Sequence, residues 1–206
     1  MNGKFVTIEG CEGVGKSTLI GGLKKYFLDH GVDAVFTREP GGTPAAEKIR
    51  GLILDAANSS ITPYAELLLY AASRAQHTEE FILPELKRGR VVVCDRYSDS
   101  TLAYQGYARG LDHDVCRGLN KLAERGVKID LTLFLDLDPE AGFRRKGGAD
   151  KSDRLEKESL EFHKKVYAGF KALAATEERF VSIDASKTSD EVLASAINAL
   201  KERGII

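Results

Sequence analysis

The residues with the clearest chemical meaning form a glycine-rich run near the start of the chain. The run follows the apolar segment 5–8, opens a helix-like stretch over 18–30, and consists of Gly10, Cys11, Glu12, Gly13, Val14, Gly15, Lys16 and Ser17. Its glycines let backbone N–H groups turn inward around a polyphosphate, and Lys16 supplies a positive charge for the β- and γ-phosphates. Because the Ser17 hydroxyl is a suitable Mg²⁺ ligand, the sequence predicts an ATP- or GTP-binding loop that extends to Thr18. A glycine-rich turn with a helix-capping serine is the weaker alternative.

The elements that must position this loop follow from the apolar pattern. Short apolar runs typical of buried parallel strands occur at 5–8, 91–94, 131–137 and 180–183, with a weaker run at 34–37. Stretches of helical period separate them, including a long one over 63–87 in which Pro84 is expected to cause a kink. This alternation predicts an α/β fold: a five-stranded parallel sheet with helices on both faces and ligands at the carboxyl ends of the strands.

Composition favours one domain that acts on small molecules. The 206 residues are 43% hydrophobic, which is enough for a single buried core. A net charge of -1 gives no general attraction for nucleic acid or a membrane surface. We expect neither a membrane span nor a signal peptide, because no apolar run is long enough. Three cysteines without metal-ligand spacing fit a reducing cytoplasm: Cys11, Cys94 and Cys116.

An acid and an arginine follow the run 91–94. Asp95 ends this predicted strand, a position from which a carboxylate reaches the Mg²⁺ of a bound nucleotide. Arg96 is next in the chain, and its guanidinium could bind a phosphate through two N–H groups. A structural ion pair between Arg96 and Asp95 is equally compatible with the sequence.

A second arginine stands at the entrance of a tight turn. Arg38 follows the run 34–37 and precedes Glu39-Pro40-Gly41-Gly42-Thr43, whose proline and glycines specify an exposed turn. Its place at the carboxyl end of a strand predicts a phosphate contact, although an ordinary strand-to-helix turn capped by Thr43 is the alternative. Arg50 is a further candidate for the same phosphate, or else an exposed helical residue.

One strongly charged segment, from about 143 to 154, interrupts the alternation of strands and helices. It carries several basic residues and a pair of glycines between two helical stretches. On composition alone it reads as a solvated loop. Its basic charge beside a nucleotide site favours a mobile lid instead.

Taken together, these motifs resemble the thymidylate kinases, which transfer the γ-phosphate of ATP to dTMP. The matching segments keep their order over most of the chain: 8–18, 36–43, 95–97, 100–106 and 153–156. The acid inside the phosphate loop and the Arg-Glu-Pro-Gly-Gly turn make the match far more specific than the loop itself. The resemblance implies a P-loop kinase fold, Mg²⁺ as cofactor, ATP and dTMP as substrates, and a homodimer.

The resemblance also implies roles for single residues. Glu12 is expected to accept a hydrogen bond from the 3′-hydroxyl of dTMP, while Arg38 and Arg96 clamp its phosphate. Tyr70 stacks on thymine, and Arg74, one helical turn later, donates to the base O4. The other implied substrate residues are Ser100, Thr101 and Gln105, the last two at the pyrimidine edge, and Tyr104, whose ring crowds a ribose 2′-hydroxyl. By helical spacing alone, both tyrosines would be assigned to packing.

One position departs from part of the family. Some members carry a basic residue directly after the loop acid, whereas this chain has Gly13. Charge for the transferring phosphoryl group must then come from the lid, as in the subclass with a catalytic lid arginine. Arg145 is our first candidate, followed by Arg144 and Arg154, and the first two are also expected to contact ATP. The expected catalytic set is completed by Lys16, Arg38 and Arg96.

Two alternative functions remain to be separated from this one. The first is a kinase of the same fold that accepts another nucleoside monophosphate. The second is a GTP-dependent switch protein, but the guanine-reading pattern Asn-Lys-x-Asp is missing, because Asn120-Lys121 is followed by Leu122 and Ala123. In either kinase, an anionic acceptor phosphate needs positioning and charge neutralisation rather than a strong general base.

Overall fold

Five strands form one parallel sheet in the computed structural model, which describes residues 3–147 and 153–206. The strands in chain order are β1 (Lys4–Glu9), β2 (Ala34–Arg38), β3 (Val91–Asp95), β4 (Leu131–Asp136) and β5 (Phe180–Asp184). Their spatial order is β2-β3-β1-β4-β5, and every pairing is parallel. The predicted fold class is therefore confirmed. β2 is an edge strand and only half-buried, which explains its weaker apolar pattern.

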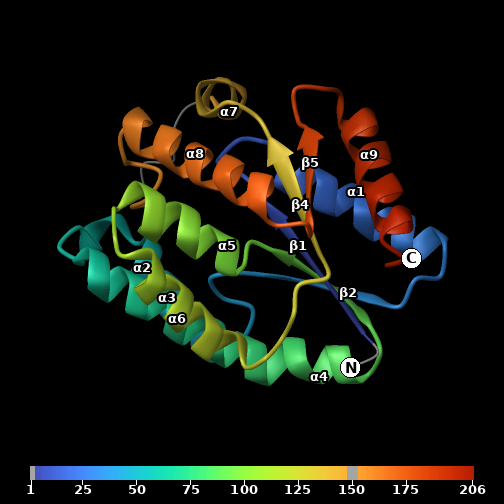
Figure 1. Ribbon diagram of the computed structural model, residues 1–206, viewed down its shortest axis with the longest axis horizontal. Helices are drawn as coiled ribbons and strands as arrows, with labels where there is room; N and C mark the ends of the chain where they lie inside the picture. Colours follow the sequence, from blue (N-terminus) through green and yellow to red (C-terminus); the bar gives the residue numbers. More distant parts are fainter. Residues whose placement is uncertain (1–2, 148–152) are drawn as a thin grey trace.

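Helices cover both faces of the sheet. Figure 1 shows α1 and α9 together on one face, and α3, α6 and α8 on the other. The helices are α1 (Lys16–Asp29), α2 (Pro44–Leu54), α3 (Pro63–His77), α4 (Leu83–Lys87), α5 (Ser98–Thr101), α6 (His113–Glu124), α7 (Pro139–Lys146), α8 (Leu160–Thr176) and α9 (Ser189–Glu202). A 3₁₀ turn at Ala56–Asn58 and π-helical turns at Thr78–Ile82 and Leu102–Ala108 complete the set. Among the described helices, none has the length and apolar character needed to cross a membrane.

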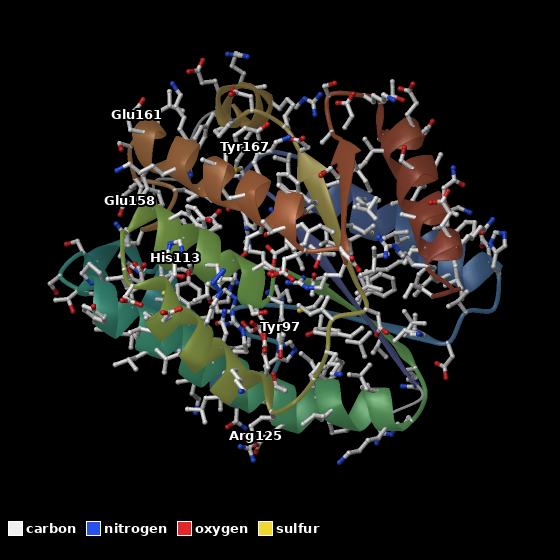
Figure 2. All side chains as sticks on the ribbon, in the orientation of Figure 1. Tyr97, His113, Arg125, Glu158, Glu161 and Tyr167 are labelled. Carbon is white, nitrogen blue, oxygen red and sulfur yellow. The ribbon has the colours of Figure 1, made fainter. Side chains whose placement is uncertain are left out.

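Alternate residues of the central strand β1 point into different layers. Val6 and Ile8 belong to the larger apolar core, which includes the buried leucines of α1. On the opposite face, Phe5 packs edge to face against Tyr97, with ring centroids 4.9 Å apart. Figure 2 shows Tyr97 in the interior of the molecule. Glu9 lies on the same face as Phe5 and is fully buried, so this side of β1 carries a carboxylate beneath the carboxyl edge of the sheet.

The long helix expected over 63–87 is divided into three parts. α3 ends at His77, a π-helical turn follows, and α4 begins at Leu83. Pro84 has no N–H for a helical hydrogen bond, so the disturbance expected there takes the form of the π turn just before it. The turn brings Thr78 Oγ1 to 2.9 Å from the Tyr97 hydroxyl.

The first part of the predicted lid is helical. α7 carries residues 139–146 and ends at Gly147, whose φ is 78°. After residues 148–152, which lie outside the described chain, Asp153 pairs through its backbone with Asp55. Both ends of the predicted lid therefore attach to elements that border the carboxyl edge of the sheet.

Candidate active site

The phosphate-binding loop joins β1 to α1 and encloses its own lysine. Lys16 Nζ donates to the carbonyl oxygens of Cys11 (3.1 Å) and Gly10 (3.4 Å). Burial and the nearby charge of Arg96 lower the pKa of Lys16. The Cys11 side chain packs into the core, where burial raises the thiol pKa to about 12, so this residue serves the loop through its backbone.

Position 13 of the loop lies directly against α7. Gly13 has a φ of 72°, and a Cβ atom there would overlap the carbonyl oxygen of Gly142. A Cβ atom on Gly142 would in turn overlap the carbonyl oxygen of Glu12. This arrangement leaves no room for a basic side chain at position 13, which gives a physical reason for the departure noted in the sequence.

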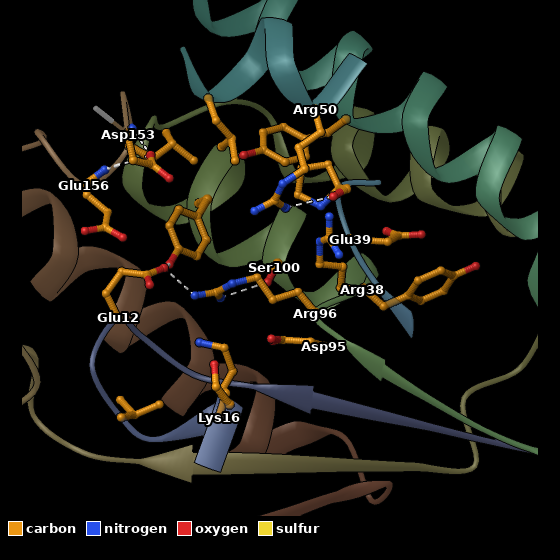
Figure 3. Close-up of a pocket in the computed structure, with 18 of the residues that line it drawn as sticks. Glu12, Lys16, Arg38, Glu39, Arg50, Asp95, Arg96, Ser100, Asp153 and Glu156 are labelled. Carbon is orange, nitrogen blue, oxygen red and sulfur yellow. Dashed lines mark hydrogen bonds and ion pairs between the residues drawn. The ribbon is translucent and has the colours of Figure 1, made fainter. Parts of the chain in front are cut away.

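A cavity of about 430 Å³ opens where β1, β2 and β3 end (Figure 3). Most predicted site residues line it: Glu12, Gly13, Val14, Gly15, Lys16, Ser17, Arg38, Arg50, Tyr70, Arg74, Asp95, Arg96, Ser100, Thr101, Tyr104, Gln105 and Arg145. Five predicted residues lie outside its lining: Gly10, Cys11, Thr18, Arg144 and Arg154. The sheet therefore gathers side chains from distant segments at its carboxyl edge, as parallel α/β folds do.

Arg96 has a backbone conformation that is rare for a non-glycine residue, with a φ of 66°. Its Nη2 donates to Glu12 Oε1 at 2.5 Å, and its Nη1 donates to Ser100 Oγ at 3.3 Å (Figure 3). The guanidinium also lies over the Tyr104 ring, 5.2 Å from the centroid. Of the two possibilities that the sequence leaves open, an ion pair with Asp95 is not formed in the described chain; the partner is Glu12.

The same interaction sets the charge of the loop acid. Burial tends to raise the pKa of Glu12, but the positive charges of Arg96, Lys16 and Lys146 outweigh it and lower this pKa to about 2. Glu12 is therefore a carboxylate at neutral pH and can accept a hydrogen bond from a ligand hydroxyl.

Asp95 and Ser17 offer hard oxygen ligands beside Lys16. Asp95 Oδ1 is buried and has no hydrogen-bond partner in the described part of the chain, while Ser17 is exposed at the start of α1. Mg²⁺ in kinases is held by one or two protein oxygens together with phosphate oxygens and waters. An unsatisfied carboxylate oxygen next to a phosphate loop fits that pattern.

Two further arginines project from the end of β2 and from α2. Arg38 Nη2 lies 2.9 Å from both carboxylate oxygens of Glu47, and Arg50 Nη1 donates to the Pro40 carbonyl at 2.8 Å. Burial and the charge of Arg38 lower the pKa of Arg50. A guanidinium whose charge is disfavoured by burial and by a neighbouring cation favours the binding of an anion beside it. Glu47, which anchors Arg38, had no role in the sequence interpretation.

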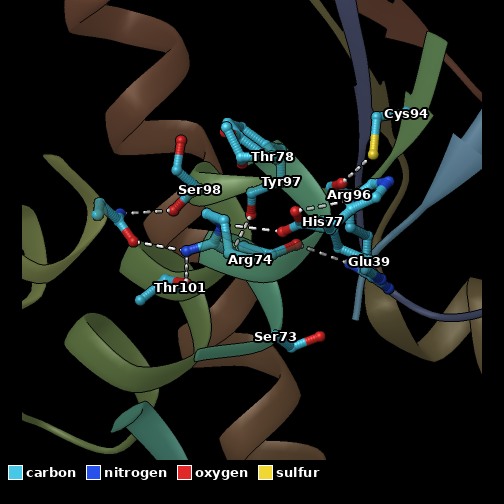
Figure 4. Close-up of polar contacts among 12 residues, drawn as sticks. Glu39, Ser73, Arg74, His77, Thr78, Cys94, Arg96, Tyr97, Ser98 and Thr101 are labelled. Carbon is cyan, nitrogen blue, oxygen red and sulfur yellow. Dashed lines mark hydrogen bonds and ion pairs between the residues drawn. The ribbon is translucent and has the colours of Figure 1, made fainter. Parts of the chain in front are cut away.

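Arg74 is buried and lies in a dense hydrogen-bond network (Figure 4). Its Nε donates to Glu39 Oε2 at 2.8 Å, and its Nη2 donates to the Tyr97 carbonyl at 3.1 Å. Its Nη1 donates to Thr101 Oγ1 at 2.9 Å and to Asn120 Oδ1 at 2.7 Å. A guanidinium has five N–H groups, so the fifth, on Nη2, is without an acceptor in the described chain. Arg74 also lines the cavity, so its guanidinium borders the space that a ligand would occupy.

Glu39 is a site residue that the sequence interpretation missed. Its Oε1 lies 3.0 Å from His77 Nδ1, and His77 Nε2 lies 2.7 Å from Thr37 Oγ1. Glu39 thus connects Arg74 to the end of β2. The Arg-Glu-Pro turn that contains Glu39 was visible in the sequence, but its buried partner lies 35 residues away.

The π turn after α5 presents Tyr104 and Gln105. The Tyr104 hydroxyl donates to Glu12 Oε1 at 3.3 Å, and its ring packs against aromatic side chains of α8. Gln105 Nε2 donates to Glu66 at 2.9 Å, which leaves its carbonyl oxygen for other partners. Tyr70, half-buried on α3, lines the same cavity, and burial raises its pKa.

The lid arginines lie in three different environments. Arg145 lines the cavity, and its Nη1 and Nη2 donate to the carbonyl oxygens of Ala185 (2.5 Å) and Ser186 (2.9 Å). Arg144 is mostly exposed and lies 3.9 Å from Glu140. Arg154, by contrast, is buried: its Nη1 lies 2.6 Å from Glu66, and its Nε donates to the Ile53 carbonyl at 2.9 Å. Arg154 thus ties the end of the lid to α2 and α3 and does not line the cavity.

Two other lining residues had no role in the sequence interpretation. Lys146 ends α7 and pairs with Glu156, and its charge contributes to the lowered pKa of Glu12. His163 on α8 is buried, which lowers its pKa, and both of its ring nitrogens lack a hydrogen-bond partner within the described residues. Lys146 sits in a run of basic residues, and His163 in an amphipathic helix, so their sequence contexts carry no specific signal.

Comparison with known proteins agrees with this geometry. The family model for thymidylate kinase matches residues 8–196. A thymidylate kinase of Finegoldia magna is 46% identical over 202 residues, covering 98% of this chain and 100% of the relative. One of Synechococcus sp. (strain JA-3-3Ab) is 51% identical over 200 residues (97% and 96%), and one of Halalkalibacterium halodurans is 44% identical over 204 residues (98% and 97%). The chain belongs to the thymidylate kinase family, as its motifs and its parallel sheet indicated.

Proposed function

We propose that this chain transfers the γ-phosphate of ATP to dTMP, giving ADP and dTDP as a step toward dTTP. The observation that carries the proposal is a single cavity in which a phosphate loop, a set of arginines and the buried Arg74 converge. The loop suits a triphosphate donor. Arg38, Arg50 and Arg96 suit the phosphate of a second nucleotide, because guanidinium groups bind phosphate oxygens in pairs. A nucleoside monophosphate kinase requires both features.

On the donor side, Lys16 and the loop N–H groups bind the β- and γ-phosphates. Ser17 would hold Mg²⁺ directly and Asp95 would hold it through water. When bound, the ion neutralises charge on the donor phosphates. Arg145 would add positive charge to the transferring group once it leaves its carbonyl partners after β5.

On the acceptor side, the arginines hold the monophosphate in line with the donor. The acceptor oxygen is already anionic near neutral pH, so positioning supplies most of the rate. Glu12, kept ionised by Arg96, accepts a hydrogen bond from the 3′-hydroxyl of the deoxyribose. Closure of the lid excludes water and thereby suppresses ATP hydrolysis.

Base selection follows from α3 and the segment after β3. Tyr70 stacks on thymine, and the fifth N–H of Arg74 donates to O4. Thr101 and Gln105 contact the pyrimidine edge, and Tyr104 occupies the space that a ribose 2′-hydroxyl would need. Ser100 supports the phosphate arginine rather than the base, because its hydroxyl accepts from Arg96.

An ADP-release assay with ATP, Mg²⁺ and a panel of nucleoside monophosphates tests the proposal. We expect turnover of dTMP well above that of dCMP, dGMP and AMP, and little release without an acceptor. Preference for another monophosphate would retain the kinase reaction but contradict the roles of Tyr70 and Arg74. Release of ADP that does not depend on any acceptor would contradict the kinase assignment.

We further propose that the enzyme is a cytoplasmic homodimer that pairs through α2, α3 and α6. These helices pack on one another, and they expose large apolar side chains: Leu52, Tyr64, Leu68, Val115 and Leu122. Apolar side chains gathered over adjacent helices are typical of a protein interface. Three buried thiols in the described structure are compatible with a reducing compartment.

A further inference from the structure

A fully buried carboxylate lies behind the phosphate arginine. Glu9 is the last residue of β1, and no lysine or arginine in the described ranges forms an ion pair with it. Its Oε1 accepts from the Tyr97 backbone N–H at 2.8 Å, and its Oε2 accepts from Ser100 Oγ at 2.6 Å. A buried carboxylate without a direct countercharge costs stability, and here both of its oxygens accept hydrogen bonds from the segment that follows Arg96.

Both hydrogen bonds of Glu9 bear on the position of Arg96. Tyr97 directly follows Arg96, whose φ is 66°. By accepting from the Tyr97 N–H, Glu9 therefore stabilises the left-handed turn at Arg96 on its C-terminal side. Ile8, which precedes Glu9 in β1, stabilises the same turn, because its carbonyl accepts from the Arg96 N–H at 3.0 Å. The end of β1 therefore holds this turn by one main-chain and one side-chain contact.

The second hydrogen bond of Glu9 fixes the direction in which the Ser100 hydroxyl donates. A serine hydroxyl has one proton, and here it is given to Glu9. The serine lone pairs are then free to accept from Arg96 Nη1, which lies 3.3 Å away. The other terminal nitrogen of Arg96 reaches Glu12. A side-chain relay thus runs from Glu9 through Ser100 and Arg96 to the phosphate loop.

We propose that Glu9 is a positioning residue for the acceptor phosphate, which it serves by fixing the turn and the guanidinium of Arg96. It touches neither substrate. This inference rests on the proposed function, since it assumes that Arg96 binds the phosphate of dTMP. It predicts an effect confined to ligands that carry that phosphate.

Substitution Glu9→Gln tests the relay while keeping the size of the side chain. Glutamine has one acceptor oxygen and one NH₂ group, so if the oxygen keeps the Tyr97 N–H, the NH₂ must face Ser100. Ser100 then accepts from the glutamine with one lone pair and can no longer donate its proton to position 9, so this proton competes with Arg96 Nη1 for the remaining directions around the serine oxygen. At pH 8, where Glu9 with its pKa of about 7 is mostly ionised, we expect dTMP binding, measured by titration calorimetry, to weaken about tenfold, whereas binding of thymidine, which lacks the phosphate, stays within about twofold.

A matched control and a double variant complete the experiment. Glu85→Gln alters another buried carboxylate, which pairs with Arg90 at 2.9 Å on α4 outside the cavity, and should change neither affinity. If Glu9 acts through Ser100, then Ser100→Ala combined with Glu9→Gln should weaken dTMP binding by much less than the product of the two single effects.

The possible outcomes separate this inference from the proposed function. Wild-type protein that fails to bind dTMP contradicts the proposed function. Normal dTMP binding by wild type together with unchanged binding by Glu9→Gln overturns the role of Glu9. An equal loss of dTMP and thymidine binding also overturns it, because that result indicates general damage to the site.

Discussion

Arg96 and Glu12 form an ion pair at 2.5 Å across the cavity, although they lie 84 residues apart in the chain. Each is the expected partner of a different end of the acceptor nucleotide: Arg96 of the phosphate and Glu12 of the 3′-hydroxyl. The pair therefore supplies both groups in charged form before a substrate enters. A ligand that carries both ends can compete for both residues at once, which favours an intact deoxynucleotide.

The first prediction concerns the guanidinium of Arg96. Arg96→Lys keeps the charge but cannot reach Glu12 and Ser100 together, because an ammonium group is a single point of contact. We expect kcat/KM for dTMP to fall about 100-fold, equivalent to about 2.7 kcal/mol, with little change in KM for ATP. Steady-state kinetics with each substrate varied in turn measures this.

Arg88→Lys provides the control for that variant. Arg88 is exposed and pairs with Glu85 at the end of α4, so the same substitution there should leave both KM values unchanged. If Arg96→Lys raises the KM of ATP as strongly as that of dTMP, Arg96 does not belong to the acceptor side.

The second prediction concerns discrimination against ribose. The Tyr104 ring packs between Arg96 and the aromatic side chains of α8, whereas its hydroxyl makes one long bond to Glu12. Tyr104→Phe should therefore keep the preference for dTMP over ribothymidine 5′-monophosphate within about threefold, because it keeps the ring. Tyr104→Leu should reduce that preference about tenfold or more. Equal preferences in the two variants would mean that the ring does not read the 2′ position.

The third prediction separates the lid arginines. Arg145 lines the cavity and Arg144 does not, so Arg145→Ala should lower kcat on the order of a thousandfold with a small change in dTMP affinity. Arg144→Ala is measured beside it in the same assay. A larger loss of kcat in Arg144→Ala would assign the catalytic charge to Arg144.

Much of this arrangement is readable from the sequence, because its chemistry lies in local motifs. The phosphate loop, the Arg-Glu-Pro-Gly-Gly turn and Asp95-Arg96 each follow an apolar strand, and parallel strands bring their carboxyl ends together. The sequence could not reveal contacts that depend on how separate elements pack. Gly13 against Gly142 is one such contact, and the anchoring of Arg154 by Glu66, outside the cavity lining, is another.

Glu9 illustrates the same limit for a charged residue. In the sequence it is the acid at the end of the first apolar run, one residue before the glycine loop. Only the register of β1 beside β3, with Ile8 opposite Asp95, places its carboxylate under the turn at Arg96. Its neighbour Asp99, held by Arg179 through two 2.7 Å contacts, is likewise a product of packing.

The fourth prediction concerns pH and stability. Burial and the charge of Asp99 raise the pKa of Glu9 from 4.5 to about 7, against the opposing effect of Arg96. The folded protein therefore binds this proton more tightly than the unfolded chain does. The stabilisation is complete below about pH 4.5 and is lost as the pH rises through 7.

The raised pKa of Glu9 determines how the free energy of unfolding of wild type and of Glu9→Gln should differ with pH. The glutamine cannot ionise, so the free energy of unfolding of wild type relative to the variant should fall by about 3 kcal/mol between pH 4.5 and pH 8. Chemical denaturation at several pH values measures it. A difference that stays constant over this range, or that grows in favour of wild type, would contradict the raised pKa.

The last prediction concerns the proposed dimer. Leu68 on α3 and Leu122 on α6 are 56% and 66% exposed on helices that pack together, whereas Leu28 on α1 is 81% exposed on the other face of the sheet. A glutamate in a buried interface is left as a desolvated charge without a partner, which costs several kcal/mol. Leu68→Glu should therefore convert a dimer into a monomer at micromolar concentration, as measured by light scattering after size exclusion. Leu28→Glu introduces the same charge at a still more exposed leucine and should remain dimeric. A monomeric wild type would contradict the dimer, and a dimeric Leu68→Glu would move the interface away from α3.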